Sequence, residues 1–311
     1  MTQIATCPVC NEGEFSLVFP VKDYAVSGEI FDILECRNCR VRITHPIPGK
    51  NQIDRYYESD EYLPHSETSR GILGFLYRQV QKLMITRKRK VVENVSNSSS
   101  GRLLDVGCGT GEFVFEMARS GWKVDGIDAN KQARVTAHKR YGIDVKSPGQ
   151  LKNRRGFEFD VITFWHALEH LHNLNDYLRK IRSYLKNDGF LLVATPNYES
   201  FDGDYYQADW AAYDVPRHLY HFNYQSLTLL LQRNGFAVTQ IRRLPFDSFY
   251  ISILSEQYKG ESLIRGLWIG LRSFLNALSD PRRCSSIIYI LTKNRSAEDM
   301  ARKETLADQW R

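Results

Sequence analysis

The stretch Arg102-Leu103-Leu104-Asp105-Val106-Gly107-Cys108-Gly109-Thr110-Gly111 decides the fold of this 311-residue chain. Five residues typical of a short buried strand run into a glycine turn, and residues 112–120 carry apolar side chains at helical spacing. A glycine loop between a first strand and its helix places a ligand at the carboxyl edge of a parallel sheet. The stretch therefore predicts a ligand-binding α/β domain that begins near residue 101.

Strands and helices alternate after this loop. The pattern predicts strands at 122–127, 143–146, 159–165 and 189–195, with helices at 131–140 and 174–186. Such alternation predicts a parallel sheet with helices on both faces. Upstream, residues 71–95 have helical spacing and end in a basic run, Arg87-Lys88-Arg89-Lys90. We interpret that run as a solvated helix end rather than as a nucleic-acid contact.

The chemistry of the loop narrows its ligand. The spacing is GxGxG, which differs from the GxGxxG of dinucleotide-binding enzymes and lacks the Lys-Ser/Thr of a phosphate loop. Asp105 stands just before the loop, where a carboxylate disfavours pyrophosphate and suits a ligand with an ammonium group. Asp128 ends the second strand and is placed to accept both hydroxyls of a ribose. The alternative for Asp128 is the N-cap of the helix at 130–140.

Four of the six cysteines form two CxxC pairs, Cys7/Cys10 and Cys36/Cys39. Each pair brings two thiolates together, and the two pairs complete a tetrahedral zinc site. Residues 14–19 and 30–35 between them have the pattern of a β-hairpin. We therefore predict a structural zinc ribbon over residues 1–45, because so short a segment buries little core and zinc supplies folding energy.

The motifs at 103–111, 124–128, 159–170 and 185–197 together resemble those of class I S-adenosylmethionine-dependent methyltransferases. The resemblance covers about residues 100–245 and implies a Rossmann-like, seven-stranded sheet whose last strand, 286–292, is antiparallel. A subgroup with an N-terminal zinc ribbon, found in bacterial glycan and secondary-metabolite settings, has the stretches at 56–65 and 216–222 as well.

The resemblance also implies residue roles. Gly107, Gly109 and Gly111 would line the amino-acid moiety of the cofactor, and Asp128 would hold its ribose. The other expected cofactor contacts are Asp105, Phe164, the adenine neighbours Gln150 and Leu151, and the lid residues Tyr57 and Tyr62. S-adenosyl-L-methionine and structural Zn²⁺ are the expected cofactors.

Five of the eight histidines lie in two short stretches, 166–172 and 218–221, and are candidates for removing the acceptor's proton. His166, Glu169 and His170 stand at i, i+3 and i+4, so one helical turn would project them together, and His218 and His221 follow the fifth strand. In one interpretation a histidine is the general base for a hydroxyl. In a second the group binds a divalent ion, as the similar Glu-x-x-Glu-His turn does in small-RNA and ubiquinone O-methyltransferases. In a third these residues only order the local structure.

The remaining segments complete the predicted organisation. We expect a linker and lid helices at 46–100, the methyltransferase domain at 101–293, an acceptor-covering insertion at 198–224, a helical insertion at 245–284 and a polar tail at 294–311. Residues 263–278 carry an apolar helical stripe that predicts core, a dimer interface or contact with a membrane surface.

Taken together, the sequence predicts a cytoplasmic enzyme that methylates oxygen on a small-molecule or glycan-linked acceptor. Peripheral contact with the inner face of a membrane is part of the same expectation. The alternatives are C- or N-methylation of a nucleotide-activated sugar and an inactive zinc-ribbon binding module. A net charge of +6 that lies mostly beyond residue 240 argues against nucleic acid as the substrate. The start of the chain lacks the layout of a secretory signal, and no apolar run is long enough to span a bilayer.

Overall fold

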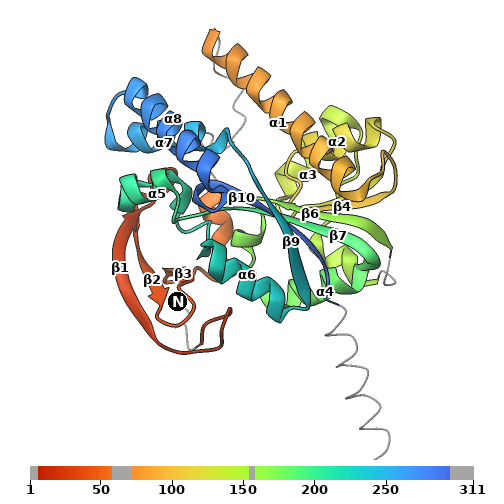
Figure 1. Cartoon of the computed structure of the whole chain (residues 1–311), viewed down its shortest axis with the longest axis horizontal. Coiled ribbons are helices and arrows are strands. Elements are labelled where there is room, and N and C mark those ends of the chain that lie inside the picture. Colours follow the sequence, from red (N-terminus) through yellow and green to blue (C-terminus); the bar gives the residue numbers. More distant parts are fainter. Residues whose placement is uncertain (1–5, 58–71, 154–157, 295–311) are drawn as a thin grey trace, which may run out of the picture.

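A six-stranded mixed sheet forms the centre of the protein (Figure 1). The computed structural model describes residues 6–57, 72–153 and 158–294, without the side chains of 72–79 and 151–153. The strand order is β5-β4-β6-β7-β10-β9, and β10 alone runs antiparallel to its neighbours. The strands are β4 (Arg102–Val106), β5 (Lys123–Ile127), β6 (Phe159–Trp165), β7 (Leu185–Pro196), β9 (Phe236–Arg243) and β10 (Ser286–Lys293). The predicted Rossmann-like fold with its antiparallel final strand is confirmed.

Helices cover both faces of this sheet (Figure 1). One face carries α1 (Ile72–Ser96), α2 (Glu112–Arg119) and α3 (Lys131–Tyr141), and the other carries α4 (Leu174–Tyr184) and α6 (Tyr224–Arg233). The central strands β4 and β6 are almost entirely buried, as parallel strands under two helix layers must be.

Two predicted boundaries differ from the structure. The expected strand at 143–146 is reduced to one parallel bridge between Ile127 and Lys146, because Pro148 lacks an N–H and the chain turns there into the 3-10 helix η2 (Pro148–Asn153). The described sheet therefore has six strands where seven are expected. The helix predicted at 174–186 ends at Tyr184, because Leu185 already pairs with Phe159 of β6.

The N-terminal segment forms a second sheet, in the order β1-β2-β3-β8. The predicted hairpin pairs β1 (Phe15–Lys22) with β2 (Ile30–Cys36), and β3 (Arg42–His45) follows. The fourth strand, β8 (Tyr220–His221), comes from the segment after β7. One apolar cluster joins Val41 and Ile43 to Leu219 and Phe222. The ribbon and the central sheet thus share a core.

The two insertions lie at the edge between these sheets. The segment after β7 forms α5 (Phe201–Tyr206) and buries Tyr198, Tyr206, Trp210 and Tyr213 in a cluster that also contains Phe31 of β2. The helical insertion forms α7 (Asp247–Lys259) and α8 (Leu263–Ser279). Among the described residues, no helix combines the length and the apolar character that crossing a membrane requires.

Candidate active site

The four paired cysteines converge into one buried group. The Sγ atoms of Cys7 and Cys39 lie 3.5 Å apart, as do those of Cys10 and Cys36. All four Sγ atoms lie within 4.8 Å of one another. A disulfide needs about 2.05 Å, whereas Zn–S bonds of about 2.3 Å put tetrahedral sulfurs about 3.8 Å apart. The thiols therefore fit a closed structural zinc site, which leaves no ligand position for chemistry.

The backbone shapes both halves of this zinc site in the same way. The amide of Asn11 donates to the carbonyl of Cys7, and the amide of Arg40 donates to that of Cys36. Asn11 and Arg40 both have positive φ, at 68° and 62°. A left-handed residue after each CxxC turns the chain back so that both thiols of the pair face the same point.

The glycine loop follows β4 as predicted. The amides of Gly107 and Cys108 donate to the carbonyl of Ile127 at 2.8 and 3.0 Å, which fixes the loop against the end of β5. Gly107 has φ +73°, and a Cβ there would stand 2.4 Å from the Cβ of Ala167. A Cβ on Gly109 would meet nothing within 4 Å. The loop thus packs beside the histidine segment at its first glycine and leaves open space above its second. Gly111, with φ +88°, precedes α2 directly.

Two carboxylates flank the loop. Asp105 is buried and accepts a 2.6 Å hydrogen bond from the Thr163 hydroxyl, and burial raises its pKa to about 7. Asp128 accepts from the amides of Gly109 and Asn130, each at 2.8 Å. The N-cap of α3 is Asn130, so the capping alternative for Asp128 is wrong. Open space above Gly109, with an acid on either side of the loop, suits a ligand with an ammonium group and ribose hydroxyls, and the residues present fit S-adenosylmethionine.

The other expected cofactor contacts are placed as follows. Phe164 is fully buried in β6, and Gln150 is exposed, where its side chain accepts from the amide of Ser147. Leu151 belongs to η2, but its side chain lies outside the described residues, and Tyr62 lies outside them altogether. Tyr57, at the end of η1 (Ile53–Tyr57), places its hydroxyl 3.1 Å from Nδ1 of His170.

His166, Glu169 and His170 lie together, but not on an α-helical turn. His166 has φ +54°, and only residues 168–170 form a short 3-10 helix, η3. His166 Nδ1 lies 3.6 Å from Oε1 of Glu169, and its Nε2 lies 3.0 Å from Oδ2 of Asp247. Burial alone would lower the pKa of His166, but these two carboxylates outweigh it and raise that pKa to about 9. His166 is therefore a cation at neutral pH.

Asp247, at the start of α7, is a site residue that sequence reasoning missed. Its partner precedes it by some eighty residues, and no local motif marks it. Burial works to raise the pKa of Asp247, but the contact with His166 prevails and lowers it. The helical insertion thus supplies one wall of the site.

The proton positions on His170 and His218 follow from their partners. Nδ1 of His170 lies 3.0 Å from the carbonyl oxygen of Arg217, and Nδ1 of His218 lies 2.8 Å from that of Ala212. A carbonyl oxygen only accepts, so both Nδ1 atoms carry hydrogen and both Nε2 atoms keep a lone pair in the neutral rings. The two rings meet edge to face, with centroids 4.6 Å apart.

Glu169 lies beside these rings and near His166, but it lacks a hydrogen bond. The residue is 1% exposed, and neither carboxylate oxygen has a hydrogen-bonding partner among the described residues. Burial favours its neutral form, but the three histidines around it outweigh this and lower its pKa. Ligand atoms of Glu169, His170 and His218 all lie within 4.8 Å of one another. An unsatisfied buried carboxylate beside two lone pairs can take a proton donor or a cation.

His221 does not join this group. Its Nε2 lies 3.0 Å from the Thr44 hydroxyl, which itself donates to the carbonyl of His218 at 2.6 Å. The hydroxyl hydrogen is therefore used, and Nε2 of His221 must donate. Burial lowers the pKa of His221 well below its ordinary value, so the ring is neutral and holds β8 against β3.

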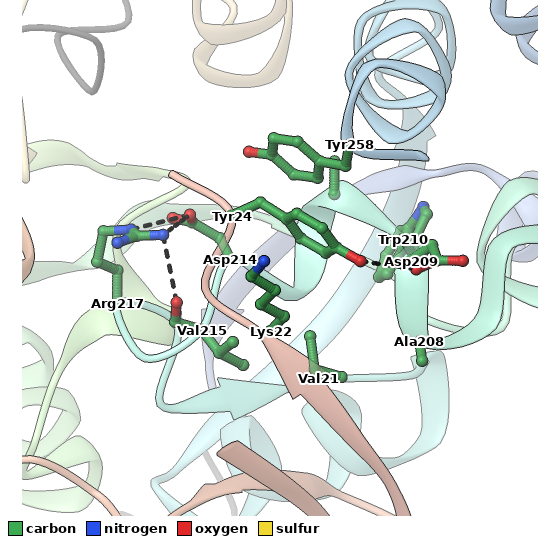
Figure 2. Close-up of a pocket in the computed structure, with 11 residues that line it drawn as sticks. Val21, Lys22, Tyr24, Ala208, Asp209, Trp210, Asp214, Val215, Arg217 and Tyr258 are labelled. Atoms are coloured by element: carbon green, nitrogen blue, oxygen red, sulfur yellow. Dashed lines mark hydrogen bonds and ion pairs between the residues drawn. The ribbon is translucent and has the colours of Figure 1, made fainter. Parts of the chain in front are cut away.

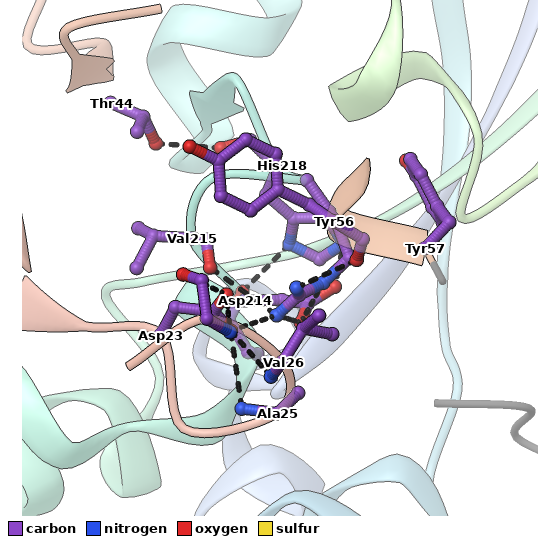
Figure 3. A network of polar contacts seen from close by, with 12 residues as sticks. Asp23, Ala25, Val26, Thr44, Tyr56, Tyr57, Asp214, Val215 and His218 are labelled. Carbon is purple, nitrogen blue, oxygen red and sulfur yellow. Dashed lines mark hydrogen bonds and ion pairs between the residues drawn. The ribbon is translucent and has the colours of Figure 1, made fainter. Parts of the chain in front are cut away.

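A buried ion-pair network connects the ribbon to the histidines (Figure 3). Arg217 is 1% exposed, and its Nη2 lies 2.8 Å from Asp23 and 2.7 Å from Asp214. Its Nη1 also donates to the carbonyl of Tyr56. Asp23 accepts from three amides and a hydroxyl within its own 23–27 turn. The carbonyl of Arg217 accepts a hydrogen bond from Nδ1 of His170. The ribbon therefore orients the His170 ring through Arg217.

A shallow pocket lies on the far side of this network (Figure 2). It holds about 230 Å³ of space, open to solvent, and Tyr24, Asp209, Asp214, Arg217 and Tyr258 are among its lining residues. The Tyr24 and Tyr258 rings stack at 4.7 Å. Asp214 and Arg217, which adjoin the histidine cluster, also line this pocket. Glu169, His170 and His218 do not line it.

Comparison with known proteins agrees with this geometry. The methyltransferase-domain family matches residues 77–241. The ubiquinone biosynthesis O-methyltransferase of Pelagibacter ubique is 37% identical over 103 residues, which are 31% of this chain and 42% of the relative. That of Rhodopseudomonas palustris is 29% identical over 163 residues, or 49% of this chain and 64% of the relative. The chain thus spans about two fifths of the first of these relatives.

Among solved structures, the Burkholderia thailandensis 1,6-didemethyltoxoflavin-N1-methyltransferase is 13% identical, with a TM-score of 0.49 over 89% of this chain and all of that one. The [4+2]-cyclase SpnF is 19% identical, with a TM-score of 0.47 over 67% of this chain and 80% of that one. The family match spans more than half of the chain and includes both the glycine loop and the histidine cluster. The chain therefore belongs to the methyltransferase-domain family.

Proposed function

We propose that the protein is an S-adenosylmethionine-dependent O-methyltransferase that acts on a small-molecule or glycan-linked hydroxyl. The observation that carries this is the buried Glu169 carboxylate, which lacks a hydrogen bond and is grouped with His170 and His218, beside a glycine loop with open space above it. The names of the curated relatives, ubiquinone biosynthesis O-methyltransferases, support oxygen as the methylated atom.

The roles of the loop residues follow from their contacts. Bound S-adenosylmethionine supplies a methyl group on a cationic sulfur. Asp128, which the Gly109 amide orients, holds the ribose side of the ligand, and Asp105 stands on the side of its ammonium group. Methyl transfer is an in-line displacement, so these residues contribute alignment rather than covalent chemistry.

We assign proton acceptance to Nε2 of His218. It lies 3.9 Å from Oε1 of Glu169 and 4.0 Å from Oδ2 of Asp214, so two carboxylates stabilise the imidazolium that forms. The pKa of His170, by contrast, is lowered to about 4 by burial and by the neighbouring His218. His170 therefore stays neutral and positions the acceptor or its partner ring.

A second mechanism uses the same group to hold a divalent cation. Metal-binding histidines commonly donate Nδ1–H to a carbonyl while Nε2 coordinates, and His170 and His218 both have this arrangement. A cation between them and Glu169 would lower the pKa of a bound hydroxyl and would need no basic histidine.

Cofactor binding is tested by calorimetry with S-adenosylmethionine. Asp128→Ala is expected to weaken affinity at least tenfold, whereas Asp144→Ala, which removes an exposed acid that pairs with His138, should leave it unchanged. Equal affinities in both variants would exclude Asp128 from the site, and no binding to the unmodified protein would support the inactive-module alternative.

Methyl transfer is tested with labelled cofactor and a small-molecule extract, and mass spectrometry of the product identifies the methylated atom. His218→Asn should reduce turnover at least a hundredfold while cofactor affinity is kept. If a chelator abolishes turnover and one divalent metal restores it, the metal mechanism is supported. Methylation at nitrogen or carbon would contradict the proposed reaction.

The surroundings of the enzyme form part of the same proposal. We place it in the cytoplasm, with a small molecule as its acceptor, and we propose contact with the inner face of a membrane through residues 263–278. Measurement of the protein's molecular mass in solution tests the alternative that residues 263–278 form the interface of a homodimer.

A further inference from the structure

In the hairpin of α7 and α8, helix α8 buries mostly small residues and exposes large apolar ones. The buried face of α8 consists of Gly266, Ile269, Gly270, Ser273 and Ala277. The residues of its outer face are 36–78% exposed and are Leu263, Ile264, Leu267, Trp268, Leu271, Leu275 and Leu278. In water the usual arrangement is the reverse, because burying large apolar side chains is what stabilises a helix against its neighbour.

The close contact between α7 and α8 depends on the glycines in the buried face of α8. A Cβ on Gly266 would stand 2.8 Å from Cα of Ile253, and one on Gly270 would stand 2.7 Å from Cα of Phe249. The buried residues of α7 are Ser248, Ile251, Ser252, Ser255 and Glu256, and the carbonyl oxygens of Ser252 and Ser248 lie beside Gly266 and Gly270. Close backbone approach over glycine and serine is the way helices associate in lipid, where no hydrophobic force drives large side chains together.

The charges around the stripe favour an anionic surface. Helix α8 contains Arg265 and Arg272 and no acidic residue. Figure 1 shows α1 rising on the same side of the sheet as the hairpin. On α1, Lys82, Arg87 and Lys90 are exposed beside the exposed apolar residues Val80 and Leu83. Cations next to an apolar stripe match acidic headgroups above acyl chains.

The acidic groups near these arginines do not reverse this charge. Arg265 contacts the buried Glu256 at 3.6 Å and the exposed Glu261 at 3.8 Å, and it also donates to the Tyr205 hydroxyl. Arg272 lies over the ring of Phe201. Both arginines lie on the flank of α8 and not on its apolar face. A second copy packed antiparallel about Trp268 would bring Arg265 of one chain near Arg272 of the other, which disfavours that occupant.

We propose that the outer face of α8, from Leu263 to Leu278, docks parallel to the surface of a bilayer that contains anionic lipid, with α1 cations near its headgroups. At about 1.5 Å per residue, 17 residues form a rod of about 25 Å that lies in the interface rather than crossing it. Trp268, 58% exposed at mid-helix, is the side chain best suited to that depth.

Flotation of the full chain with vesicles tests the proposal. One set is 3:1 phosphatidylcholine to phosphatidylglycerol, and the other is pure phosphatidylcholine. We expect binding to the anionic set and at least tenfold weaker binding of the double variant Ile264→Gln/Trp268→Ser. The matched control is Leu17→Gln/Ile30→Gln, which removes apolar residues of similar exposure, 59% and 67%, from the ribbon. It should bind like the unmodified chain.

Three outcomes overturn membrane docking itself, and a fourth overturns the part that the cations play in it. The first is no binding to either vesicle, and the second is equal loss in both double variants. The third is a dimer in solution that the α8 variant abolishes without any vesicle binding, which would assign the stripe to a second copy. Binding to pure phosphatidylcholine at equal strength would overturn the role of the cations. S-adenosylmethionine affinity, measured in parallel, confirms that each variant is folded.

Discussion

Replacing Asp23 with Asn tests whether the ribbon and the active site are energetically coupled. The Asp23 carboxylate is fully buried and lies 2.8 Å from Arg217. Burial works to raise the pKa of Asp23, but the Arg217 guanidinium and the donors of the turn outweigh it, so that pKa is lowered. Asn keeps the size of the side chain, removes the negative charge and leaves one oxygen for the donors.

The loss of unfolding free energy expected for Asp23→Asn depends on the ion pairs that Arg217 retains. Breaking a buried ion pair costs about 3–5 kcal/mol, because the surviving charge stays buried. Arg217 retains Asp214 at 2.7 Å, so we expect the lower end, about 3 kcal/mol. That is a large share of the roughly 5–15 kcal/mol by which domains of this kind are stable.

Urea denaturation followed by tryptophan fluorescence measures this cost. Asp209→Asn is the matched control, since that exposed acid pairs with Lys259 at 3.6 Å in the same region and should cost less than about 1 kcal/mol. The double variant Asp23→Asn/Arg217→Met should show at least about 1 kcal/mol of coupling. A loss below about 1 kcal/mol for Asp23→Asn would refute the reasoning, as would unchanged turnover, because the Arg217 carbonyl holds His170.

The remaining predictions concern pH, metal and the glycine loop. The folded-state pKa of His166, about 9, exceeds the ordinary 6.5, so its contribution to stability is present below pH 6.5 and lost as pH rises through 9. Its side chain is 30% exposed, so we expect about 2 kcal/mol, and Asp247→Asn should flatten this part of the stability–pH curve. One zinc ion per chain should be found by elemental analysis, and Cys36→Ser should abolish it and destabilise the β3–β8 pairing; equal stability with and without metal would contradict a structural role. Gly107→Ala should destabilise the fold through the 2.4 Å approach to Ala167, whereas Gly109→Ala meets no atom and should cost only about 1–2 kcal/mol for its left-handed φ of +54° while it weakens cofactor binding, as thermal shift and calorimetry would show. The same effect from both glycine variants would argue against open space above Gly109.

Local features of the sequence determined the alternation of strands and helices, the glycine loop and the two cysteine pairs. Each is set by a few adjacent residues: positive φ at Gly107 and Gly111, two CxxC turns, and an acid at the end of β5. These features depend only on short-range backbone geometry, so the sequence by itself is enough to identify them.

Tertiary structure alone decided which distant side chains meet. Asp247 reaches His166, and Arg217 joins Asp23 to the carbonyl that holds His170, because strand order and helix packing bring together segments with no shared local pattern. It also placed His221 in β8, away from Glu169, and turned the apolar stripe of α8 outward. Helical periodicity shows that a helix has an apolar face, but the side to which that face turns depends on what the rest of the chain offers it. Here the α7 backbone at Ile253 and Phe249 comes too close to leave room for side chains at Gly266 and Gly270.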